Sequence, residues 1–400
     1  MVFLVNVQVQ TENELMNNTA SAYLHQLQPF AIQFTESIGI RWYGLAYLSG
    51  FALSYLVILW VVRQGRSPMR RDDIVDFVTM VAIGTMIGGR LGYCVFYAPD
   101  LFLKFSSDFP FWGVLEVHKG GMASHGGILG VIVSSSLYAY RRGFSPFHAM
   151  DLTVFGGSLG IFFGRLANFV NGELFGRICE EACRFGVKFP QEVYLWYRLA
   201  LEGKNLEGDP LVKLKSLGEA VSALGRIQLN GKTYDSISPG LWQSWVDSFG
   251  ANSSKISAAL GSLVDAVQMH NAQVVAAIEP VLSVRYPSQL YQALMEGLGV
   301  FVVLALIWMK PRKVGVVSAW FGILYALARI VGEAYRLPDA EIGYQFLGLT
   351  RGQILSIVML AMVFVYFIYV VRRSGSKVGG WGVRKNTSVI DETEASKGAR

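Results

Sequence analysis

Charged residues are scarce in this chain. They make up 16% of its 400 residues, whereas hydrophobic residues make up 52% and the mean hydropathy is +0.38. Soluble globular domains carry about 25% charged residues, so the composition excludes an ordinary soluble protein. Residues 42–62, 314–328 and 352–371 contain no charge at all. Because about 20 residues of apolar helix cross the hydrocarbon core of a bilayer, the sequence predicts an integral membrane protein.

Cysteine is almost absent as well. The three cysteines, Cys94, Cys179 and Cys183, are too few for a disulfide framework. Cys179 and Cys183 are spaced four apart, and cysteines at this spacing on a helix are more often unbridged. We expect free thiols here, with a disulfide as the alternative.

Acidic residues do not cluster as metal ligands do. A metal-dependent lipid phosphotransferase would need several carboxylates together, whereas the acidic residues of the apolar segments are scattered. Asp72, Asp73 and Asp76 come closest to a cluster, and helix capping by the first two is the favoured interpretation. The sequence therefore predicts no metal and no other cofactor.

The apolar pattern predicts seven membrane-spanning helices. They are expected at 42–62, 74–97, 121–140, 150–171, 288–309, 314–335 and 352–371. Basic clusters follow every odd-numbered span, beginning with Arg63 and Arg66 after the first and ending with Arg372 and Arg373 after the last. Because basic loops stay in the cytoplasm, the N-terminus is predicted to be periplasmic and the C-terminus cytoplasmic. The predicted fold class is an all-α integral membrane protein.

The remaining segments divide the chain further. We expect a periplasmic N-terminal segment at 1–40, helices one to four within 41–177, helices five to seven within 286–371 and a disordered tail at 372–400. Residues 98–120 form an aromatic periplasmic arm at headgroup level. Residues 178–285 carry amphipathic stretches that predict a periplasmic helical cap. The cap holds 10 basic and 11 acidic residues, which gives no sign of nucleic-acid binding.

Several polar side chains fall inside the predicted spans. Arg90, Arg165 and Arg329 lie towards the outer ends of even-numbered spans, and His125 begins the third. Two of them have a structural explanation of their own: Arg329 can pair with Glu333 four residues on, and Arg90 can reach the headgroups. Further polar residues in or beside the spans complete the set: Asn168, Asn171, Glu173, Gln289 and Tyr325. A polar set of this size inside a membrane usually surrounds a ligand or a path.

Clustered arginines at headgroup depth suit a phosphate group, because the guanidinium fork grips phosphate oxygens. The glycine-rich run at 120–130, which includes Gly126, would let backbone N–H groups approach an anion closely. We therefore expect a membrane phospholipid as ligand. A secondary transporter for a phosphorylated solute is the competing interpretation, but it predicts inverted repeats that the sequence does not display.

Four motifs carry a family resemblance. "HGGILGV" from His125, "GRLANFVNGELFGR" from Gly164, "PSQLYQALMEG" from Pro287 and "RIVGEAYRLPDA" from Arg329 resemble prolipoprotein diacylglyceryl transferase, and the likeness runs from about residue 41 to residue 371. The resemblance implies a bacterial inner-membrane enzyme that faces the periplasm. Its partners would be phosphatidylglycerol and the lipobox peptide of a preprolipoprotein. The enzyme would move diacylglyceryl from the lipid to the lipobox cysteine and release glycerol 1-phosphate, without metal or cofactor.

The resemblance also implies the functional positions, which match the motifs at Tyr43, His125, Arg165, Asn168, Asn171, Glu173, Gly176, Tyr325, Arg329 and Glu333. We expect His125, Arg165, Arg329 and Tyr325 to be catalytic. The others, together with Arg90, Gly126 and Gln289, are expected to bind substrate. The family commonly has histidine before "PSQLY", where Tyr286 stands here.

The expected chemistry needs a base and an anion site. A free thiol has a pKa of about 8.5 and reacts as thiolate, so His125, with an ordinary pKa near 6.5, would take its proton. Tyr325, Glu333 or an arginine-bound thiolate are alternatives for this step. Arg165 and Arg329 would stabilise the phosphate as it leaves.

Overall fold

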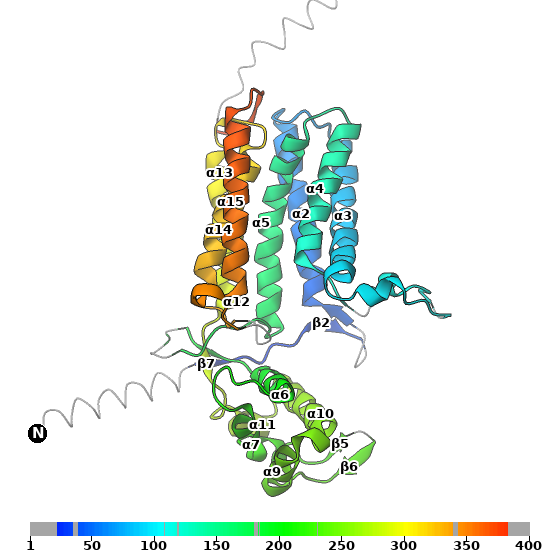
Figure 1. Ribbon diagram of the computed structural model, residues 1–400, viewed down its shortest axis with the longest axis vertical. Coiled ribbons are helices and arrows are strands. Elements are labelled where there is room, and N and C mark those ends of the chain that lie inside the picture. The colour runs from blue at the N-terminus through cyan, green and yellow to red at the C-terminus, as the bar shows by residue number, and fades with distance from the viewer. Residues whose placement is uncertain are drawn as a thin grey trace, which may run out of the picture. The chain divides into compact units, whose positions relative to one another are not determined.

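The computed structural model describes residues 22–34, 39–107, 109–117, 120–179, 183, 185–229, 231–338 and 343–382. Helices occupy all seven segments predicted to span a membrane (Figure 1). They are α2 (Trp42–Arg63), α3 (Asp73–Phe96), α4 (Ser124–Arg141), α5 (Pro146–Val170), the run of α12 (Ser288–Gln292), η4 (Ala293–Gly299) and α13 (Val300–Ile307), α14 (Val316–Gly332) and α15 (Arg351–Arg372).

Five helices in the described part of the chain are long and apolar enough to cross a membrane: α2, α3, α5, the α12–α13 run and α15. α14 is shorter, with 17 residues, and α4 is diluted by its serines and glycines. The chain is therefore a helix-rich, multi-pass membrane protein. The count of seven spans and the orientation of the termini stay predictions.

The chain divides into two compact units. The first comprises Met1–Ala46, Phe162–Met295 and Leu327–Val358, and the second comprises Tyr47–Ile161, Glu296–Ala326 and Met359–Arg400. The boundary passes through α2, α5, α14 and α15, whereas the sequence suggested boundaries between the helices and the cap. The first unit therefore holds one end of several helices together with the cap.

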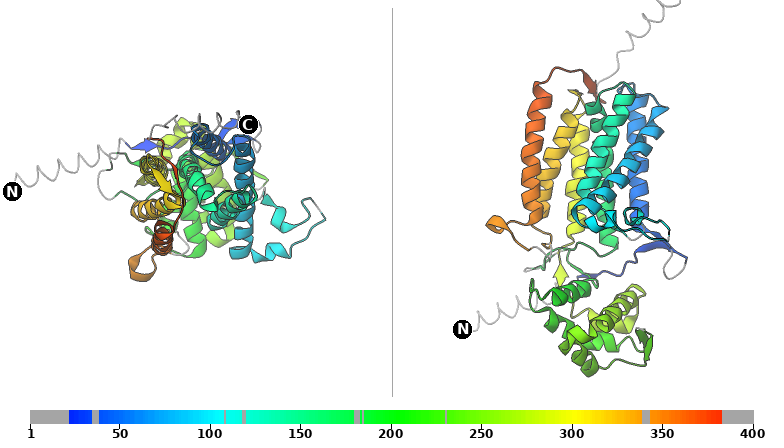
Figure 2. Two further views of the ribbon diagram at one scale, coloured as in Figure 1. Left: turned by 90° about the horizontal axis from the view of Figure 1, so that it is seen from above. Right: turned by 45° about the vertical axis from the view of Figure 1, so that its right-hand side comes forward.

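The predicted cap is mainly helical, with a small hairpin added (Figure 2). Its elements are α6 (Glu192–Glu202), α7 (Pro210–Lys215), α8 (Gly218–Ser222), β5 (Ile227–Leu229), β6 (Lys232–Tyr234), α9 (Pro239–Asp247), α10 (Phe249–Gln268) and α11 (Ala272–Ile278). Their apolar faces pack into one core around the buried Trp196 and Trp242. The Trp242 indole donates to the Leu214 carbonyl at 2.7 Å, so the polar atom of this buried side chain has a partner.

A short sheet joins the cap segment to the chain before α2. β1 (Tyr23–Leu24) pairs in parallel with β4 (Val187–Lys188), which pairs antiparallel with β7 (Val284–Arg285). Next to β1, the buried His25 lies between the rings of Phe169 and Phe189, with its Nε2 2.7 Å from the Phe169 carbonyl. A hairpin of β2 (Phe30–Gln33) and β3 (Gly39–Arg41) leads into α2.

In the second unit, α3 and α4 run side by side (Figures 1 and 2). A Cβ added to Gly130 would lie 2.0 Å from the Gly84 carbonyl oxygen, and one added to Gly88 would lie 2.4 Å from the Gly126 carbonyl oxygen. The backbones approach this closely only because side chains are missing, as the glycine spacing predicted.

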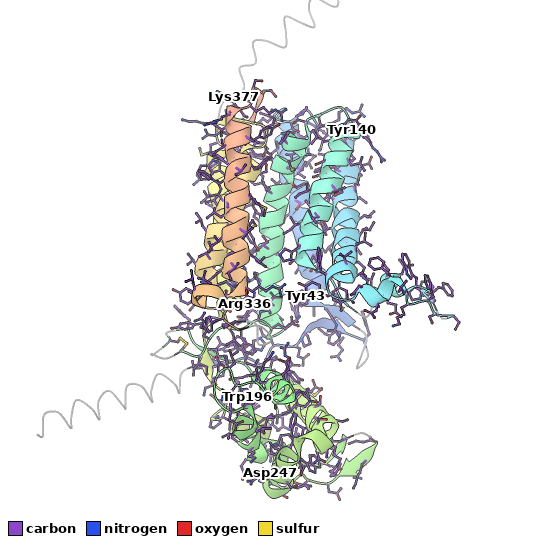
Figure 3. All side chains as sticks on the ribbon, viewed as in Figure 1. Tyr43, Tyr140, Trp196, Asp247, Arg336 and Lys377 are labelled. Atoms are coloured by element: carbon purple, nitrogen blue, oxygen red, sulfur yellow. A yellow bond between two sulfur atoms is a disulfide. The ribbon has the colours of Figure 1, made fainter. Side chains whose placement is uncertain are left out.

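The predicted tail is partly structured. β8 (Pro311–Lys313) pairs with β9 (Lys377–Gly379), and Lys377 is labelled in Figure 3. The Trp381 indole donates to the Ala305 carbonyl at 2.9 Å, and its ring packs against Trp60 and Trp308. Disorder was predicted from 372, but residues 377–382 fold back because Trp381 finds an aromatic site that composition does not reveal. Residues 383–400 lie outside the described residues.

Candidate active site

The motif after Gly164 straddles the end of α5. Arg165 and Asn168 lie in the last turns of the helix, and Gly172 follows it with φ +66°. The Glu173 amide donates to the Asn168 carbonyl at 2.9 Å, which is how helices commonly end on a left-handed residue. Leu174 also has a positive φ, +55°. The polar residues of this apolar segment therefore mark a helix end and the non-helical stretch after it, residues 172–177, here named the signature segment.

Tyr43 joins α2 to the signature segment. Its hydroxyl donates to Glu173 Oε2 at 2.9 Å and also contacts Asn168 Oδ1. Asn168 is buried, Tyr43 is half-buried and Glu173 is exposed. Figure 3 labels Tyr43 at the start of α2. Polar groups from two helices and the signature segment thus meet, as the motifs predicted.

Three buried side chains from residues 285–289 hold the backbone of the signature segment. Gln289 Nε2 donates to the Glu173 carbonyl at 2.7 Å, Ser288 Oγ donates to the Leu174 carbonyl at 3.0 Å, and Arg285 Nη1 donates to the Gly176 carbonyl at 3.0 Å. All three donors have an exposed fraction of 0%. One charged and two neutral donors bind three carbonyls within four residues, and so fix the path of a segment that has no helix or sheet to hold it.

Gly176 fills a narrow space in this arrangement. Its amide donates to the Tyr286 carbonyl at 3.0 Å. A Cβ added there would lie 2.4 Å from the Tyr286 carbonyl oxygen and 2.6 Å from the Tyr335 carbonyl oxygen. Only glycine fits between these two backbones. The predicted substrate-binding role of Gly176 is thus accompanied by a structural one.

Glu333 is the centre of a second polar cluster. Its buried carboxylate forms an ion pair with Arg329, lies 3.8 Å from Arg336 Nη1 and accepts a hydrogen bond from Thr350 Oγ1 at 2.9 Å. A Cβ added to Gly352 would lie 2.6 Å from the Glu333 carboxyl carbon, so glycine leaves room for this carboxylate. The pairing of Arg329 with Glu333, considered from their spacing, is present.

Arg177 links this cluster to the signature segment. Its Nε donates to the Arg336 carbonyl at 3.0 Å, and its amide donates to the Tyr335 carbonyl at 3.1 Å. The guanidinium groups of Arg329 and Arg336 therefore lie near one carboxylate, and that of Arg177 donates to the backbone carbonyl of Glu333 at 3.4 Å. Their formal charge exceeds that of Glu333, which makes the cluster attractive to an anion.

Six of these residues were not among the predicted site residues. Arg177, Ser288 and Arg336 stand inside the motifs that carry the resemblance, and so could have been found there. Arg285 and Gly352 lie outside the motifs. Thr350 also lies outside them, and nothing in the sequence marks it. It comes to Glu333 only because α15 begins beside the end of α14.

The predicted site residues fall in both units. The first unit contains Tyr43, Arg165, Asn168, Asn171, Glu173, Gly176, Gln289, Arg329 and Glu333, and the second contains Arg90, His125, Gly126 and Tyr325. His125 is the second residue of α4 and its side chain is exposed, while Tyr325 stacks on Phe321. Arg165 and Asn171 are half-buried.

Arg90 differs from its predicted role. It is 6% exposed, and its guanidinium donates to the carbonyls of Gly113, Val114 and Gly120 at 2.6 to 2.8 Å. These carbonyls belong to the arm at 98–120, which contains η1 (Pro99–Phe102) and η2 (Gly113–Leu115). Because all three of its nitrogens serve backbone carbonyls, the geometry favours an anchor for the arm over a headgroup ligand.

Two further predicted residues have structural contacts. A Cβ added to Gly126 would lie 2.2 Å from the Gly88 carbonyl oxygen, so this glycine serves the packing of α3 against α4. Gln289 is wholly buried and binds the signature segment. A glycine allows two backbones to pack closely, and an amide side chain binds a backbone carbonyl. Both residue types can do this as readily as they bind anions.

The acidic residues after the first basic cluster have basic partners. Asp73 lies 3.2 Å and Asp76 lies 3.1 Å from the Arg142 guanidinium. Asp72 precedes α3 but makes no capping hydrogen bond, so the predicted cap is wrong there. Within the described residues, no three histidine, cysteine or acidic side chains lie together as metal ligands do.

Cys179 and Cys183 form a disulfide, the alternative that their spacing made less favoured. Both residues lie outside helices, with their Cα atoms 6.1 Å apart. This separation is within the range that a disulfide can bridge. The bonded pair directly follows the signature segment.

A family model described as prolipoprotein diacylglyceryl transferase matches residues 29–369. The chain belongs to this family. A phosphatidylglycerol–prolipoprotein diacylglyceryl transferase from Bdellovibrio bacteriovorus is 42% identical over 361 residues, which are 90% of this chain and 97% of the relative. Proteins of the same name from Rhodospirillum centenum and Neisseria gonorrhoeae are 31% and 30% identical, over 84% and 86% of this chain and 88% and 96% of their own.

Membership in the transferase family places the two polar clusters in context. The matched range contains the signature segment, the Glu333 cluster, residues 285–289 and the cap. The three relatives are matched over 88% to 97% of their own length. The resemblance noted from four motifs is confirmed.

Proposed function

We propose that this chain transfers the diacylglyceryl group of phosphatidylglycerol to the cysteine thiol of a prolipoprotein. The family match and the names of the relatives support this activity. The carrying observation is the Glu333 cluster, where Arg177, Arg329 and Arg336 gather beside the signature segment. A group of guanidiniums suits the phosphate that this reaction must bind and release.

The proposed reaction is a substitution at a glyceryl carbon. The cysteine sulfur forms a bond to the carbon, the carbon–oxygen bond to phosphate breaks, and the thiol proton goes to a base. Diacylglyceryl cysteine and glycerol 1-phosphate are the products. The phosphate oxygen gains negative charge as the bond breaks, and Arg329 and Arg165, fixed before the reaction begins, would stabilise that charge.

His125 is the proposed base, since histidine is the side chain that most often transfers protons in enzymes. Glu333 is less suited to this step, because Arg329, Arg336 and Thr350 already engage its carboxylate. Tyr325 stays the alternative within the second unit. Tyr43, Asn168, Asn171 and Glu173 are proposed to bind the glycerol hydroxyls and phosphate oxygens of the headgroup.

The proposed location is the bacterial inner membrane, with seven spans, the N-terminus in the periplasm and the C-terminus in the cytoplasm. The basic clusters after the odd-numbered helices support this orientation. The cap and the arm would then lie in the periplasm, where the lipobox of a preprolipoprotein emerges. The exposed Leu103, Phe105 and Phe109 of the arm suit the headgroup region of the bilayer.

The test uses the purified full-length protein in vesicles. Phosphatidylglycerol labelled in its glycerol and acyl groups is supplied with a lipobox peptide, with and without a chelator. Mass spectrometry should find diacylglyceryl on the peptide cysteine, and labelled glycerol 1-phosphate should appear in equal amount. A peptide with serine in place of cysteine is the control. Vesicle uptake of a phosphorylated solute without any transfer would instead support the transporter interpretation.

A further inference from the structure

Arg285 is the most completely buried cation in the first unit. Its exposed fraction is 0%, and its Nη2 lies 2.6 Å from Glu192 Oε1, while its Nη1 lies 3.2 Å from Glu207 Oε1. Glu192 begins α6 and Glu207 lies between α6 and α7, so both carboxylates belong to the cap. A buried charge is tolerated only when paired and hydrogen-bonded, as it is here.

The same guanidinium reaches out of the cap to the signature segment. Its Nη1 donates to the Gly176 carbonyl at 3.0 Å, and its central carbon lies 4.9 Å from the centre of the Phe175 ring. The Arg285 side chain therefore contacts the carboxylates of Glu192 and Glu207 in the cap, and the Gly176 carbonyl and the Phe175 ring in the signature segment.

We propose that Arg285 is a positioning residue, which couples the folded cap to the signature segment and thereby sets the place of the guanidinium groups around Glu333. This inference rests on the proposed diacylglyceryl transfer. It assigns the cap a role in holding the active-site geometry.

The connection from Arg285 to the arginine cluster runs through backbone hydrogen bonds. Gly176 is held between Tyr286 and Tyr335, and the next residue, Arg177, donates from its amide to Tyr335 and from its side chain to Arg336. Because Gly176 has no free space, a shift of its carbonyl must move these neighbours. A displacement of about 1 Å at reacting groups can cost about 100-fold in rate.

The cap side of the connection is also fixed. Glu192 Oε2 accepts from the Ser283 amide at 3.1 Å, and Glu192 Oε1 accepts from the Ser283 hydroxyl at 2.8 Å. Glu192 therefore holds Ser283, just before β7, and Arg285, within it. Burial disfavours the charge on Arg285, but Glu192 and Glu207 raise the pKa of its guanidinium. The Arg285 guanidinium therefore keeps its positive charge.

Lysine cannot reproduce this geometry. The planar fork of arginine directs donors to several acceptors at fixed angles, whereas a lysine ammonium is a point charge on a flexible stem. Arg285→Lys therefore keeps the charge near Glu192 and Glu207 but loses the simultaneous bond to Gly176. The variant therefore shows whether activity needs only a positive charge at this buried position or also needs the hydrogen bond to Gly176.

The experiment compares wild type, Arg285→Lys, Glu207→Gln and Glu279→Gln in the vesicle transfer assay. Glu279 is the matched control, because its carboxylate pairs at 3.7 Å with Lys188 on the neighbouring strand β4. We expect Arg285→Lys to lower kcat by about 10- to 100-fold, the range typical of residues that orient active-site groups. KM for phosphatidylglycerol should change much less, Glu207→Gln should show a smaller loss, and Glu279→Gln should match wild type.

Hydrogen exchange gives a readout that does not depend on turnover. Arg285→Lys should speed exchange at the amides of Gly176 and Arg177, with exchange in α10 unchanged. Equal kcat in Arg285→Lys and wild type, or equal exchange at both amides, overturns the inference. Should Arg285→Lys fail to fold, Glu207→Gln is read in the same way: faster exchange at the two amides supports the coupling, and unchanged exchange overturns it. A wild-type protein that transfers no diacylglyceryl refutes the proposed function instead, while the exchange result still tests the coupling.

Discussion

Ser288 donates its hydroxyl hydrogen to the carbonyl oxygen of Leu174 at 3.0 Å, and Leu174 has a left-handed backbone with φ +55°. Leucine rarely adopts this conformation, because its Cβ crowds the following carbonyl. The bond from a wholly buried hydroxyl therefore helps to hold a strained residue in the middle of the signature segment.

Ser288→Ala should destabilise the protein, because it leaves the Leu174 carbonyl without its partner. A buried acceptor that loses its donor costs about 1 to 3 kcal/mol. Denaturant unfolding in detergent, followed by the fluorescence of the cap tryptophans, measures the change. Ser262→Ala, which removes a hydroxyl that only back-bonds within helix α10, should stay within about 0.5 kcal/mol of wild type. Equal stability of the two variants would contradict the proposed role of Ser288.

Arg329→Ala and Arg165→Ala should each be nearly inactive while still inserting into the membrane. Removal of one donor that stabilises a developing anion costs about 100- to 1000-fold in rate. Initial rates of peptide modification at saturating phosphatidylglycerol measure the loss. Arg226→Ala, at an exposed ion pair of the cap, is the control and should keep the wild-type rate. Normal turnover in Arg329→Ala would remove this guanidinium from the chemistry.

Gly352→Ala tests the Glu333 cluster without removing a charge. The added methyl group would lie 2.6 Å from the Glu333 carboxyl carbon and must displace it, so the ion pair with Arg329 should be disturbed. We expect transfer activity to fall by at least about 10-fold, as for other residues that orient active-site groups. Gly240→Ala adds the same methyl group in α9, where it would meet no atom within 4 Å. Comparable activity of both variants would show that the cluster tolerates displacement of its carboxylate.

His125→Gln should lower the rate by about 100- to 10,000-fold if histidine removes the thiol proton. Initial rates of peptide modification check this expectation. A His125→Gln enzyme with near-normal turnover would transfer the role of base to Tyr325 or to an arginine-bound thiolate.

His25 should make the stability of the first unit depend on pH. Burial lowers the pKa of its imidazole, and the hydrogen bond to Phe169 opposes this shift. The folded state therefore binds fewer protons than the unfolded state below about pH 6.5, the ordinary value. Its contribution to stability is complete above that pH and is lost as the pH falls. Unfolding midpoints at pH 8 and pH 5 should differ more in wild type than in His25→Gln, and identical differences would exclude His25 as the cause.

Much of the fold was predictable because it follows from local composition. The charge-free runs placed α2 and α15, since apolar side chains avoid water wherever the helix ends up. The glycine spacing predicted the close approach of α3 and α4, and amphipathic periods predicted the cap helices. Composition was misleading in the tail, where Trp381 docks against Trp60 and Trp308. The aromatic packing of Trp381 orders this part of the tail, although the average composition of the tail is polar.

The candidate site was predictable as a set of residues but not as a set of contacts. The motifs named Tyr43, Asn168 and Glu173 together, and the structure joins them by hydrogen bonds. Arg90 carried the same sequence signal, yet its guanidinium binds the arm. The guanidinium of an arginine near a membrane surface donates hydrogen bonds to any oxygen atom within reach. The sequence does not show which oxygen atoms these are.

By itself the sequence determined that this protein is helical, lies in a membrane and belongs to the diacylglyceryl transferase family, because hydropathy and motif spacing are properties of the chain order. Only the tertiary structure decided that Arg285 holds the Gly176 carbonyl, that Thr350 binds Glu333 and that Cys179 bonds to Cys183. These contacts depend on distances of a few ångströms between segments that lie apart in the chain or outside regular helices. Packing sets such distances, and no local pattern of residues encodes them.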